Sequence, residues 1–449
     1  MSNIIKIRKG LDIALKGGAE KVLIKTTLAA TYALKPGDFQ ELIPKLVVQE
    51  GDAVQAGAPL FVDKHHPEIQ YVSPVSGIVS AIVRGEKRKL LEVVVTPDKE
   101  QEYVNHEVSN LASMSREQII ALMLQSGVWA FLKQRPYNIV ANPETTPKAI
   151  FISGFDTAPL ASDIDYSLTG EYEAFQKGID VLNKLVSKIH LGIHDQLAST
   201  SVLKKVKGVE TTIFEGPHPA GNVGVQIHYI SPINKGEIVW TIDSQHVVVL
   251  GRLFLKGIYD VSKIVALVGS EVKKPRYFRM IAGASVTNIA DNIDTENNPR
   301  YISGNVLTGS NIGKTGHLGF YDNMITVIPE GDSYEFFGWA KPLRLNKYSF
   351  SRSYLSWIFP KKEYVLNANI NGGERAFVMN GQYEKVVPMD IYPIYLLKAI
   401  LAEDIDKMEQ LGIYEVVEED LALCEFICPS KIKVQEILRN GIKLMIKEM

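Results

Sequence analysis

Residues 40 to 95 restrict the fold of this 449-residue chain more than any other stretch. They form a series of short β-branched runs separated by Gly-Asp, Ala-Gly and Pro-Val-Ser-Gly turns: QELIPKLVVQEGDAVQAGAPLFVDKHHPEIQYVSPVSGIVSAIVRGEKRKLLEVVV. Short runs between turn residues are typical of strands in antiparallel sheets. This block therefore predicts a compact β-sandwich made of many short strands.

The same block resembles the biotinyl/lipoyl-carrier domains, through EGDAVQAGAPLF, DKHHPEI and SPVSGIVSAI. In that family a modified lysine follows an aspartate in a hairpin, just before a Glu-Ile or Glu-Val pair, and Lys64 has this position here. The resemblance implies either a swinging carrier with a modified Lys64 or a carrier fold used as a structural module. Two histidines follow Lys64, where lipoyl domains usually have small or apolar residues. None of the nine histidines belongs to the HxxxDG motif expected of an associated acyltransferase.

The length exceeds what one hydrophobic core can support, so several domains are expected. After residue 100, SREQIIALMLQSGVW opens with a capping box formed by Ser115 and Gln118. A buried strand is predicted at 148–155 and an amphipathic helix at 171–189, with further strands at HLGIH and VETTIFEG. Alternating strands and helices predict a parallel, Rossmann-like sheet with crossover helices.

The remainder of the chain has two further patterns. Residues 261–340 contain strand-like runs and one predicted helix at SVTNIADNI, which suggests a small β-grasp domain. The last part begins with an aromatic segment and ends in helices by periodicity. The predicted class is a multidomain α/β protein with these parts: a carrier-like sandwich with an N-terminal segment at 1–100, a Rossmann-like domain at 101–257, a β-grasp domain at 258–340, and an extended segment with a helical end at 341–449.

Composition excludes several classes of function. Lysine and arginine (49) nearly balance aspartate and glutamate (51), so charge gives no argument for a nucleic-acid partner. Two cysteines exclude a disulfide framework and suggest a reducing compartment. No run approaches the roughly 20 apolar residues that span a bilayer, and the first residues do not look like a secretory signal. A cytoplasmic chain is expected.

The Rossmann-like part has no strong ligand motif. GxGxxG, whose glycines let the backbone approach a pyrophosphate, is absent; the nearest stretches are 153–155, 168–170 and 220–225. His190 and His194 have a spacing that suits metal ligation on a helix, but they fall in a predicted strand. There they would lie about 13 Å apart, too far to share one ion, so no metal site is predicted.

The loop GPHPAGNVGVQIHYI (216–230) is the most unusual one. It places His218, Pro219, Gly221 and Asn222 among glycines and prolines. It either brings backbone amides and an imidazole to a ligand at a domain junction, or forms a rigid interdomain turn with Asn222 as a helix N-cap. The aromatic run 335–359 likewise has two interpretations: a membrane-surface or quinone-contacting patch, or a core strand followed by a packed loop.

These segments, in this order, resemble the NqrA family, whose members are components of the bacterial Na+-translocating NADH:quinone oxidoreductases. The resemblance covers essentially the whole chain and is carried by long, idiosyncratic motifs. They are IKIRKGLDIALKGGA, DKHHPEIQYVSPVSGIV, EGPHPAGNVGVQIHYI, RYISGNVLTG, GHLGFYDNMITVIPEGDSYEFFGW and DLALCEFICPSK. The family combines a carrier-like sandwich, a Rossmann-like domain, a β-grasp domain and a helical end.

That family is in turn similar to the NADH- and flavin-binding subunits of the Rnf complex and of respiratory complex I. Those relatives have a Gly-rich flavin loop where this chain has QSGVWAFLKQRPY, with Trp129, Phe131 and Arg135 in place of small residues. They also have a cysteine-rich helical domain, whereas this chain keeps only Cys424 and Cys428 in LALCEFICPSK. Two thiolates cannot satisfy a four-ligand cluster. The resemblance therefore implies a scaffold without flavin, with the two cysteines as the relic of a cluster site.

The implied function is that of a peripheral subunit on the cytoplasmic face of the bacterial inner membrane, without catalytic residues or cofactors of its own. The complex would use flavins and iron–sulfur centres, and a multi-span membrane protein would be among the partners. Quinone would bind either partly to this chain or wholly to the membrane partner. The residues expected to contact quinone, or to form the interdomain loop, are His218, Pro219, Gly221, Asn222, Trp129 and Phe131. The alternative function is a carrier or ligand-binding protein that uses Lys64.

Overall fold

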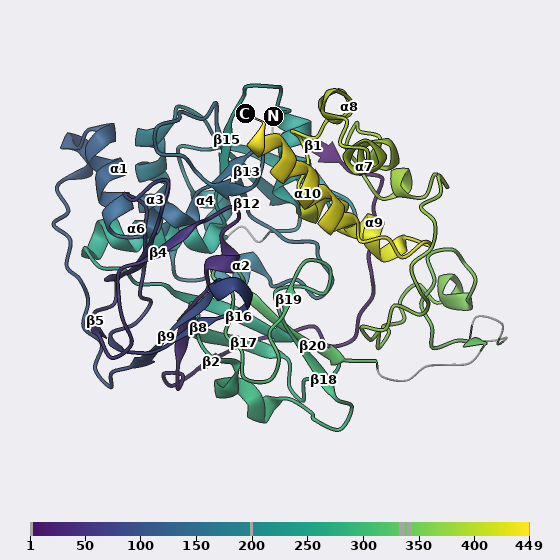
Figure 1. Ribbon diagram of the computed structural model, residues 1–449, viewed down its shortest axis with the longest axis horizontal. Coiled ribbons are helices and arrows are strands. Elements are labelled where there is room, and N and C mark those ends of the chain that lie inside the picture. Colours follow the sequence, from purple (N-terminus) through teal and green to yellow (C-terminus); the bar gives the residue numbers. More distant parts are fainter. Residues whose placement is uncertain (1–2, 198–200, 332–336, 339–340, 342–343, 449) are drawn as a thin grey trace.

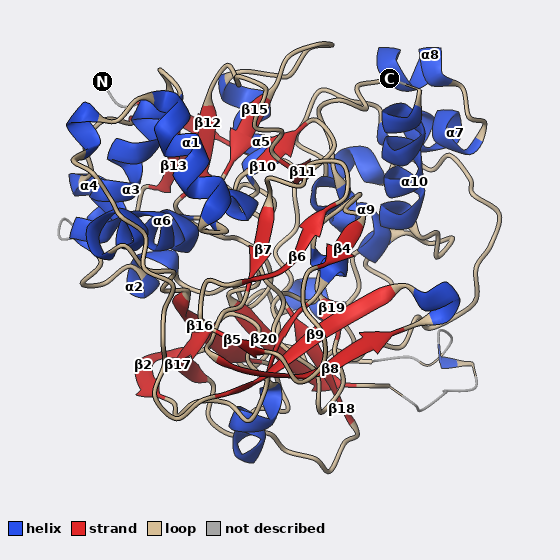
Figure 2. Ribbon diagram, turned by 60° about the vertical axis from the view of Figure 1, so that its left-hand side comes forward, coloured by secondary structure: helices blue, strands red, loops and turns tan. Residues whose placement is uncertain are grey.

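The computed structural model describes residues 3–197, 201–331, 337–338, 341 and 344–448. These residues form four β-sheets and a group of C-terminal helices, which pack around one another (Figure 1). In Figure 2 the helix-covered parallel strands lie at the top, the C-terminal helices beside them, and the remaining strands below.

The predicted sandwich consists of two small antiparallel sheets. Their buried side chains are apolar, for example Phe61 and Tyr71, which lie opposite each other on neighbouring strands with their rings stacked at 5.1 Å. One sheet has the order β3-β9-β8-β5 (Tyr32–Leu34, Leu90–Pro97, Gly77–Arg84, Ala53–Val54), and the other β4-β6-β7 (Pro44–Leu46, Pro59–Asp63, Gln70–Val72).

A seven-stranded sheet forms the α/β part. Its central strands follow a doubly wound order: β12 comes first in the chain, β13 and β14 lie to one side of it, and β15 lies on the other. All these pairs are parallel, whereas β10 and β11 extend the sheet in antiparallel fashion. The order is β1-β14-β13-β12-β15-β10-β11 (Asn3–Lys6, Glu210–Glu215, Ile189–His194, Ile150–Ser153, Val239–Thr241, Lys133–Arg135, Ile139–Val140).

Two helices of this part begin at, or one residue from, the positions that the sequence predicts, after Ser115 and at 171; the second ends at Leu185 rather than at 189, because Ile189 already starts the next strand. In α1 (Arg116–Gln125) the Ser115 hydroxyl accepts the Gln118 N–H, and the Gln118 side chain accepts the Ser115 N–H, which confirms the capping box. Helices α3 (Tyr172–Leu185) and α6 (Ser244–Lys256) pack closely against each other, and Gly178 and Gly251 lie at their crossing. The shorter helices are α2 (Ile164–Ser167), α4 (Val202–Lys205) and α5 (Val223–Ile230).

The third unit is a mixed six-stranded sheet with the order β19-β18-β20-β16-β17-β2. The helix predicted at SVTNIADNI is a 3₁₀ helix, Val286–Asn292, because its backbone hydrogen bonds join residues three apart rather than four. The strands are Ser310–Asn311, Pro299–Ser303, Met324–Pro329, Ser262–Val268, Arg276–Ile281 and Glu20–Lys25.

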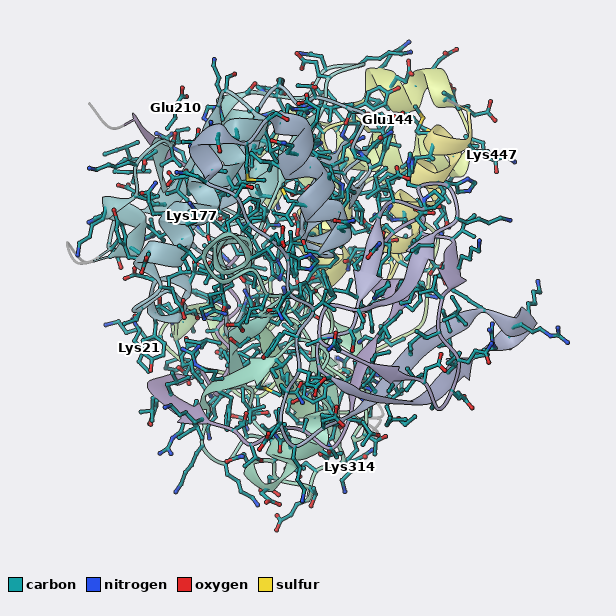
Figure 3. The ribbon with its side chains drawn as sticks, turned by 90° about the vertical axis from the view of Figure 1, so that its left-hand side faces the viewer. Lys21, Glu144, Lys177, Glu210, Lys314 and Lys447 are labelled. Atoms are coloured by element: carbon teal, nitrogen blue, oxygen red, sulfur yellow. The ribbon has the colours of Figure 1, made fainter. Side chains whose placement is uncertain are left out.

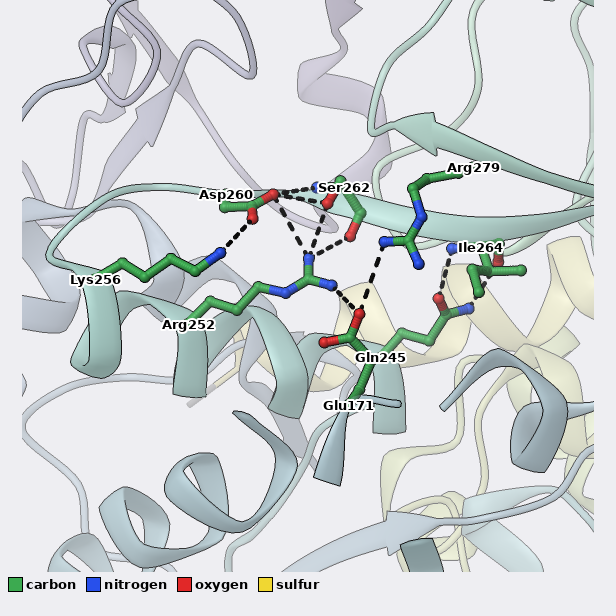
Figure 4. A network of polar contacts seen from close by, with 8 residues as sticks. All are labelled: Glu171, Gln245, Arg252, Lys256, Asp260, Ser262, Ile264 and Arg279. Carbon is green, nitrogen blue, oxygen red and sulfur yellow. Dashed lines mark hydrogen bonds and ion pairs between the residues drawn. The ribbon is translucent and has the colours of Figure 1, made fainter. Parts of the chain in front are cut away.

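Side chains of α6 connect the α/β part to this sheet (Figure 4). The Gln245 amide bonds to both the N–H and the carbonyl of Ile264, at 2.8 and 2.9 Å. Arg252 donates to the Ser262 carbonyl at 2.7 Å and forms an ion pair with Glu171 at 2.6 Å. Because these polar atoms satisfy each other, the two units are joined by bonds with defined geometry.

The N-terminal segment, which was grouped with the sandwich by prediction, pairs with two other sheets. Strand β1 adds to the edge of the seven-stranded sheet beside β14, and β2 adds to the six-stranded sheet beside β17. The four domain boundaries remain a prediction. The helical end comprises α7 (Pro393–Leu401), α8 (Ile405–Gln410), α9 (Ala422–Ile427) and α10 (Val434–Lys447).

Candidate functional site

A cavity of about 480 Å³ lies at the carboxyl ends of β12 and β15. These neighbouring strands flank the point where the strand order reverses, which is where open α/β sheets bind ligands. The sandwich, the six-stranded sheet and the helical end also contribute to its wall. The charged and aromatic lining residues are Phe131, Lys133, Arg135, Phe155, Asp156, His218, Asp243, His246, Tyr321, Asp322, Glu418 and Glu419.

The loop after β14 forms one wall of the cavity. The Thr157 hydroxyl accepts the Gly221 N–H at 2.9 Å and lies 3.1 Å from Nδ1 of His218. Burial lowers the pKa of His218 to about 4, so its imidazole is neutral at pH 7. The Ser153 hydroxyl donates to the Gly221 carbonyl at 2.9 Å. These bonds fix the loop and leave a neutral imidazole at the cavity.

Asn222 precedes α5, as expected of an N-cap, but its side chain does not cap the helix. Its Nδ2 instead donates to the Glu419 carbonyl at 3.1 Å. The predicted N-cap bond is therefore replaced by a bond to the helical end, and the loop has an interdomain contact.

An aromatic group forms the opposite wall. Phe131 stacks against His246 at 4.3 Å and against Phe320 at 4.7 Å, and the His246 and Phe320 rings lie 6.2 Å apart. His246 is 3% exposed, and its Nδ1 has no hydrogen-bond partner among the described residues. Burial lowers the pKa of His246 well below its usual value. A neutral, unpartnered imidazole beside a cavity is available to a ligand.

Lys133 reaches the cavity from β10, and its Nζ lies 3.7 Å above the Tyr321 ring. Its ammonium has no ion-pair partner within the described part of the chain. Burial lowers its pKa, an effect opposed by the charge of Glu419. The Tyr321 hydroxyl donates to the Ala130 carbonyl at 2.7 Å, which holds the ring in place. Lys133 is thus a hydrogen-bond donor held over the face of the Tyr321 ring.

Carboxylates give the cavity an acidic character. Burial raises the pKa of Asp156 to about 6, and nearby Glu419 and Asp243 add to this effect. Burial also raises the pKa of Asp243, which caps α6 by accepting the Gln245 N–H at 2.8 Å. Such an environment repels phosphate groups. The acidic side chains therefore disfavour the pyrophosphate of a dinucleotide.

A buried ion pair closes the side of the cavity towards the helical end. Arg135, 2% exposed, lies 2.5 Å from a Glu419 oxygen and 3.1 Å from an Asp420 oxygen. A Cβ on Gly224, in the first turn of α5, would lie 2.4 Å from Oδ1 of Asp420. The Asp420 carboxylate therefore fills the space at the start of α5 where a ligand anion could otherwise lie.

Four of the six predicted contact residues line the cavity: Phe131, His218, Gly221 and Asn222. Pro219 is not in the lining. Trp129 is also outside it, because its indole N–H donates to the Ala141 carbonyl at 2.7 Å and its ring packs edge-on against Trp240.

The cavity also contains residues that no sequence motif indicated: Lys133, Asp156, His246, Tyr321 and Asp322. Asp243 is a further one, and for it a signal exists: an aspartate between a short apolar strand and an apolar helical run marks a helix start at a sheet edge.

The loop that corresponds to the flavin loop of the resembled relatives has no room for a phosphate. A Cβ on Gly127 would lie 2.5 Å from the Val72 side chain of the sandwich, and Trp129 and Phe131 are buried. The residues present do not fit a flavin there.

The remaining predicted positions lie apart from the cavity. Lys64 is exposed in the turn between β6 and β7, where its N–H donates to the Ile43 carbonyl at 2.9 Å. His190 and His194 are in β13, as predicted. No cluster of metal-binding side chains is found in the described ranges. Cys424 and Cys428 are buried free thiols, and part of the aromatic run 335–359 lies outside the described residues.

The fold and cavity define a class of multidomain α/β proteins with a carrier-like sandwich and a ligand-sized cavity at the edge of a doubly wound sheet. Three family models match: "NqrA N-terminal barrel-sandwich hybrid domain" at 5–98, "NqrA second alpha/beta domain" at 114–259, and "NQRA C-terminal domain" at 264–314. The chain belongs to the NqrA family of the Na(+)-translocating NADH-quinone reductases.

Curated relatives are named as this component of the Na(+)-translocating NADH-quinone reductase. The proteins of Neisseria meningitidis serogroup B and Yersinia pestis bv. Antiqua are 39% and 38% identical. The first alignment covers 99% of this chain and 100% of the relative, and the second 97% and 98%. The superposition on a solved NAD+-reducing [NiFe]-hydrogenase covers 78% of this chain and 67% of the hydrogenase chain, with 10% identity. Its TM-score of 0.37 is too low to inform the fold. Within the described part of the chain, no helix is both long and apolar enough to span a membrane.

Proposed function

We propose that this chain is the NqrA component of a multisubunit Na+-translocating NADH-quinone reductase. It would lie peripherally on the cytoplasmic face of a bacterial inner membrane, bound to a multi-span partner. The observation that carries the proposal is the match to the Neisseria protein, which covers 99% of this chain and 100% of the relative. In this role the chain supports the complex and holds neither flavin nor cluster, while other subunits carry these redox centres.

Purification of the tagged chain from its own cells tests this proposal. We expect it to co-purify from detergent-solubilised membranes with a multi-span protein and with NADH-quinone reductase activity. The separated chain should show no flavin absorbance and no iron. Recovery of the chain alone from the soluble fraction of cells that contain the complex would contradict the proposal.

The cavity supports a second role, a contribution to the quinone site. A quinone headgroup needs apolar walls and donors for its carbonyl oxygens. Phe131 and Tyr321 supply aromatic wall, and Lys133 supplies a charged donor. The neutral imidazole of His218 lies on the same cavity.

Titration of the purified chain with a short-chain ubiquinone analogue tests this second role. We expect saturable binding that weakens at least about tenfold in Lys133→Met, the loss of one hydrogen bond to a charged donor. Lys314→Met, at an exposed lysine outside the cavity lining, serves as the matched control. Absence of saturable binding would assign the quinone site wholly to the partner.

The alternative function as a carrier depends on Lys64. Its exposed hairpin position is compatible with attachment of lipoyl or biotin. Intact-mass spectrometry of the chain from its native cells distinguishes the two functions. A mass increase located on Lys64 supports the carrier, and an unmodified mass removes it.

A further inference from the structure

The segment between the six-stranded sheet and the helical end is strongly basic. Residues 341–362, KPLRLNKYSFSRSYLSWIFPKK, contain six lysines and arginines and no aspartate or glutamate, although the whole chain has a net charge of −2. Such a one-sided stretch in a nearly neutral protein produces a local positive potential that attracts an anionic surface.

Three large apolar side chains are exposed side by side in this segment. Trp357, Ile358 and Phe359 are 55%, 47% and 46% exposed, at the end of a 3₁₀ turn, Leu355–Ile358. A contiguous apolar patch on a folded surface marks an interaction site with a protein or a membrane.

The turn that presents these side chains is fixed by hydrogen bonds. The Ser356 hydroxyl accepts the Ser349 N–H at 3.1 Å, and the Ser349 hydroxyl accepts the Ser353 N–H at 3.0 Å. The segment is tied to the body by Tyr364, whose N–H donates to the Ala14 carbonyl at 2.8 Å. It lies at the right-hand edge of Figure 1, away from the sandwich. The apolar residues are therefore displayed on an anchored turn.

Basic groups lie next to the aromatic side chains of this segment. The guanidinium of Arg352 lies 5.8 Å from the centre of the exposed Trp357 ring, and Nζ of Lys362 lies 5.5 Å from that of Tyr364, which is buried. Tryptophan and phenylalanine next to lysine and arginine form the composition of segments that lie in a bilayer interface, where the rings enter the headgroup region and the cations meet lipid phosphates.

We propose that residues 344–362 bind directly to the surface of an anionic lipid bilayer, with Trp357, Ile358 and Phe359 entering the headgroup region. A protein partner would also bury these side chains, but residues 344–362 contain no carboxylate side chain, which suits a surface that is uniformly negative. The inference does not depend on the proposed place of the chain in a complex, because it concerns the isolated chain.

Vesicle flotation with the full-length purified chain tests the charge requirement. We expect binding to phosphatidylcholine vesicles that contain phosphatidylglycerol, little binding to phosphatidylcholine alone, and weakening by salt. Arg352→Glu and Lys361→Glu should each weaken binding by about 5-fold or more. Lys314→Glu, whose side chain points into solvent at the opposite end of the molecule from the helical end (Figure 3), should leave binding unchanged.

Fluorescence tests the depth of the apolar residues. Trp129 and Trp240 are fully buried, so in a Trp339→Phe background Trp357 is the tryptophan that lipids can reach among the described ones. We expect brominated lipid to quench it, and Trp357→Ala with Phe359→Ala to weaken binding at least about tenfold. No binding to anionic vesicles overturns the proposal, as does equal binding by all variants. Loss of a membrane partner by these variants, without vesicle binding, would assign the patch to a protein.

Discussion

At the scale of single residues, the buried Arg135 holds the helical end to the α/β part. It pairs with Glu419 and Asp420, and the Asp420 side chain is fully buried. Removing one member of a buried pair leaves an uncompensated charge. We therefore expect Arg135→Met to lower the free energy of unfolding by about 3 to 5 kcal/mol in urea denaturation.

The double variant Arg135→Met/Asp420→Asn should recover much of that loss, because it removes the two fully buried charges and leaves only Glu419, whose side chain reaches water. Lys235→Met, which breaks an exposed pair with Glu409, is the control and should cost less than about 1 kcal/mol. A similarly small cost for Arg135→Met would show that the buried pair does not stabilise the junction.

Asp156 makes the stability of the molecule depend on pH, and its pKa shift sets the direction of that dependence. Burial raises its pKa to about 6 in the folded state, from 3.8 in an unperturbed chain. The folded state therefore binds the Asp156 proton more tightly than the unfolded state does. The contribution of Asp156 to the free energy of unfolding is complete below pH 4 and is lost as the pH rises through 6. We expect Asp156→Asn to raise the free energy of unfolding by about 2 to 3 kcal/mol above pH 7 and not below pH 4.

Asp98→Asn, at an exposed position, is the control and should change the stability by less than about 0.5 kcal/mol at either pH. A gain of the same size at both pH values for Asp156→Asn would indicate a packing effect rather than titration.

Cys424 and Cys428 lie in the core of the helical end. They are 0% and 2% exposed, burial raises the pKa of Cys424, and the Tyr383 hydroxyl donates to Sγ of Cys428 at 3.0 Å. Buried cysteines behave as small apolar residues. We expect Cys428→Ala to leave the iron content of the purified complex unchanged in elemental analysis. A loss of iron would reveal a cluster shared with another chain.

At the scale of elements, α3 and α6 pack at backbone contact. A Cβ on Gly251 would lie 1.7 Å from the Ala174 carbonyl oxygen, and one on Gly178 would lie 2.2 Å from that of Val247. A methyl group added at either glycine would fit only if the two helices moved apart. We expect Gly251→Ala to cost about 3 kcal/mol or more in thermal and chemical unfolding.

Gly373→Ala is the matched control, because an added Cβ there meets no atom within 4 Å. It should change stability by less than about 0.5 kcal/mol. An equally small effect of Gly251→Ala would mean that the helices separate easily.

Elements with strong local signals were predictable from the sequence. The capping box of Ser115, the amphipathic pattern of α3 and the short strands of the sandwich all depend on neighbours within a few residues. Strand β1 was not predicted, because its four residues form a strand only beside β14, more than 200 positions later. Lys133 and Asp322 line the same cavity although they lie far apart in the sequence, so no local pattern predicted them as site residues. The loop around His218 was predictable because its unusual composition is local.

At the scale of the whole molecule, the predicted four-part chain has two large apolar cores. One is continuous through the sandwich, the α/β part and the six-stranded sheet. The other joins the helical end to the N-terminal segment, through residues such as Ile13 and Leu438. We expect native-state hydrogen exchange to show α10 opening at a lower free energy than β12 and β13, which lie inside a sheet.

Arg135→Met should lower the opening free energy of α10 further while leaving that of β16 unchanged, since the ion pair connects only the helical end and the α/β part. Equal protection of α10 and β12 in both proteins would instead indicate that the whole molecule unfolds in a single step.

The pairing of β1 with β14 also has a consequence for biosynthesis. The ribosome makes β1 before its partner strand, which emerges only after roughly 200 further residues, a wait of about 10 to 40 s at bacterial elongation rates. During that time Ile4 and Ile5 of β1 belong to an unpaired apolar strand that can pair with other nascent chains. The order of synthesis thus makes this strand a target for chaperones that bind nascent chains.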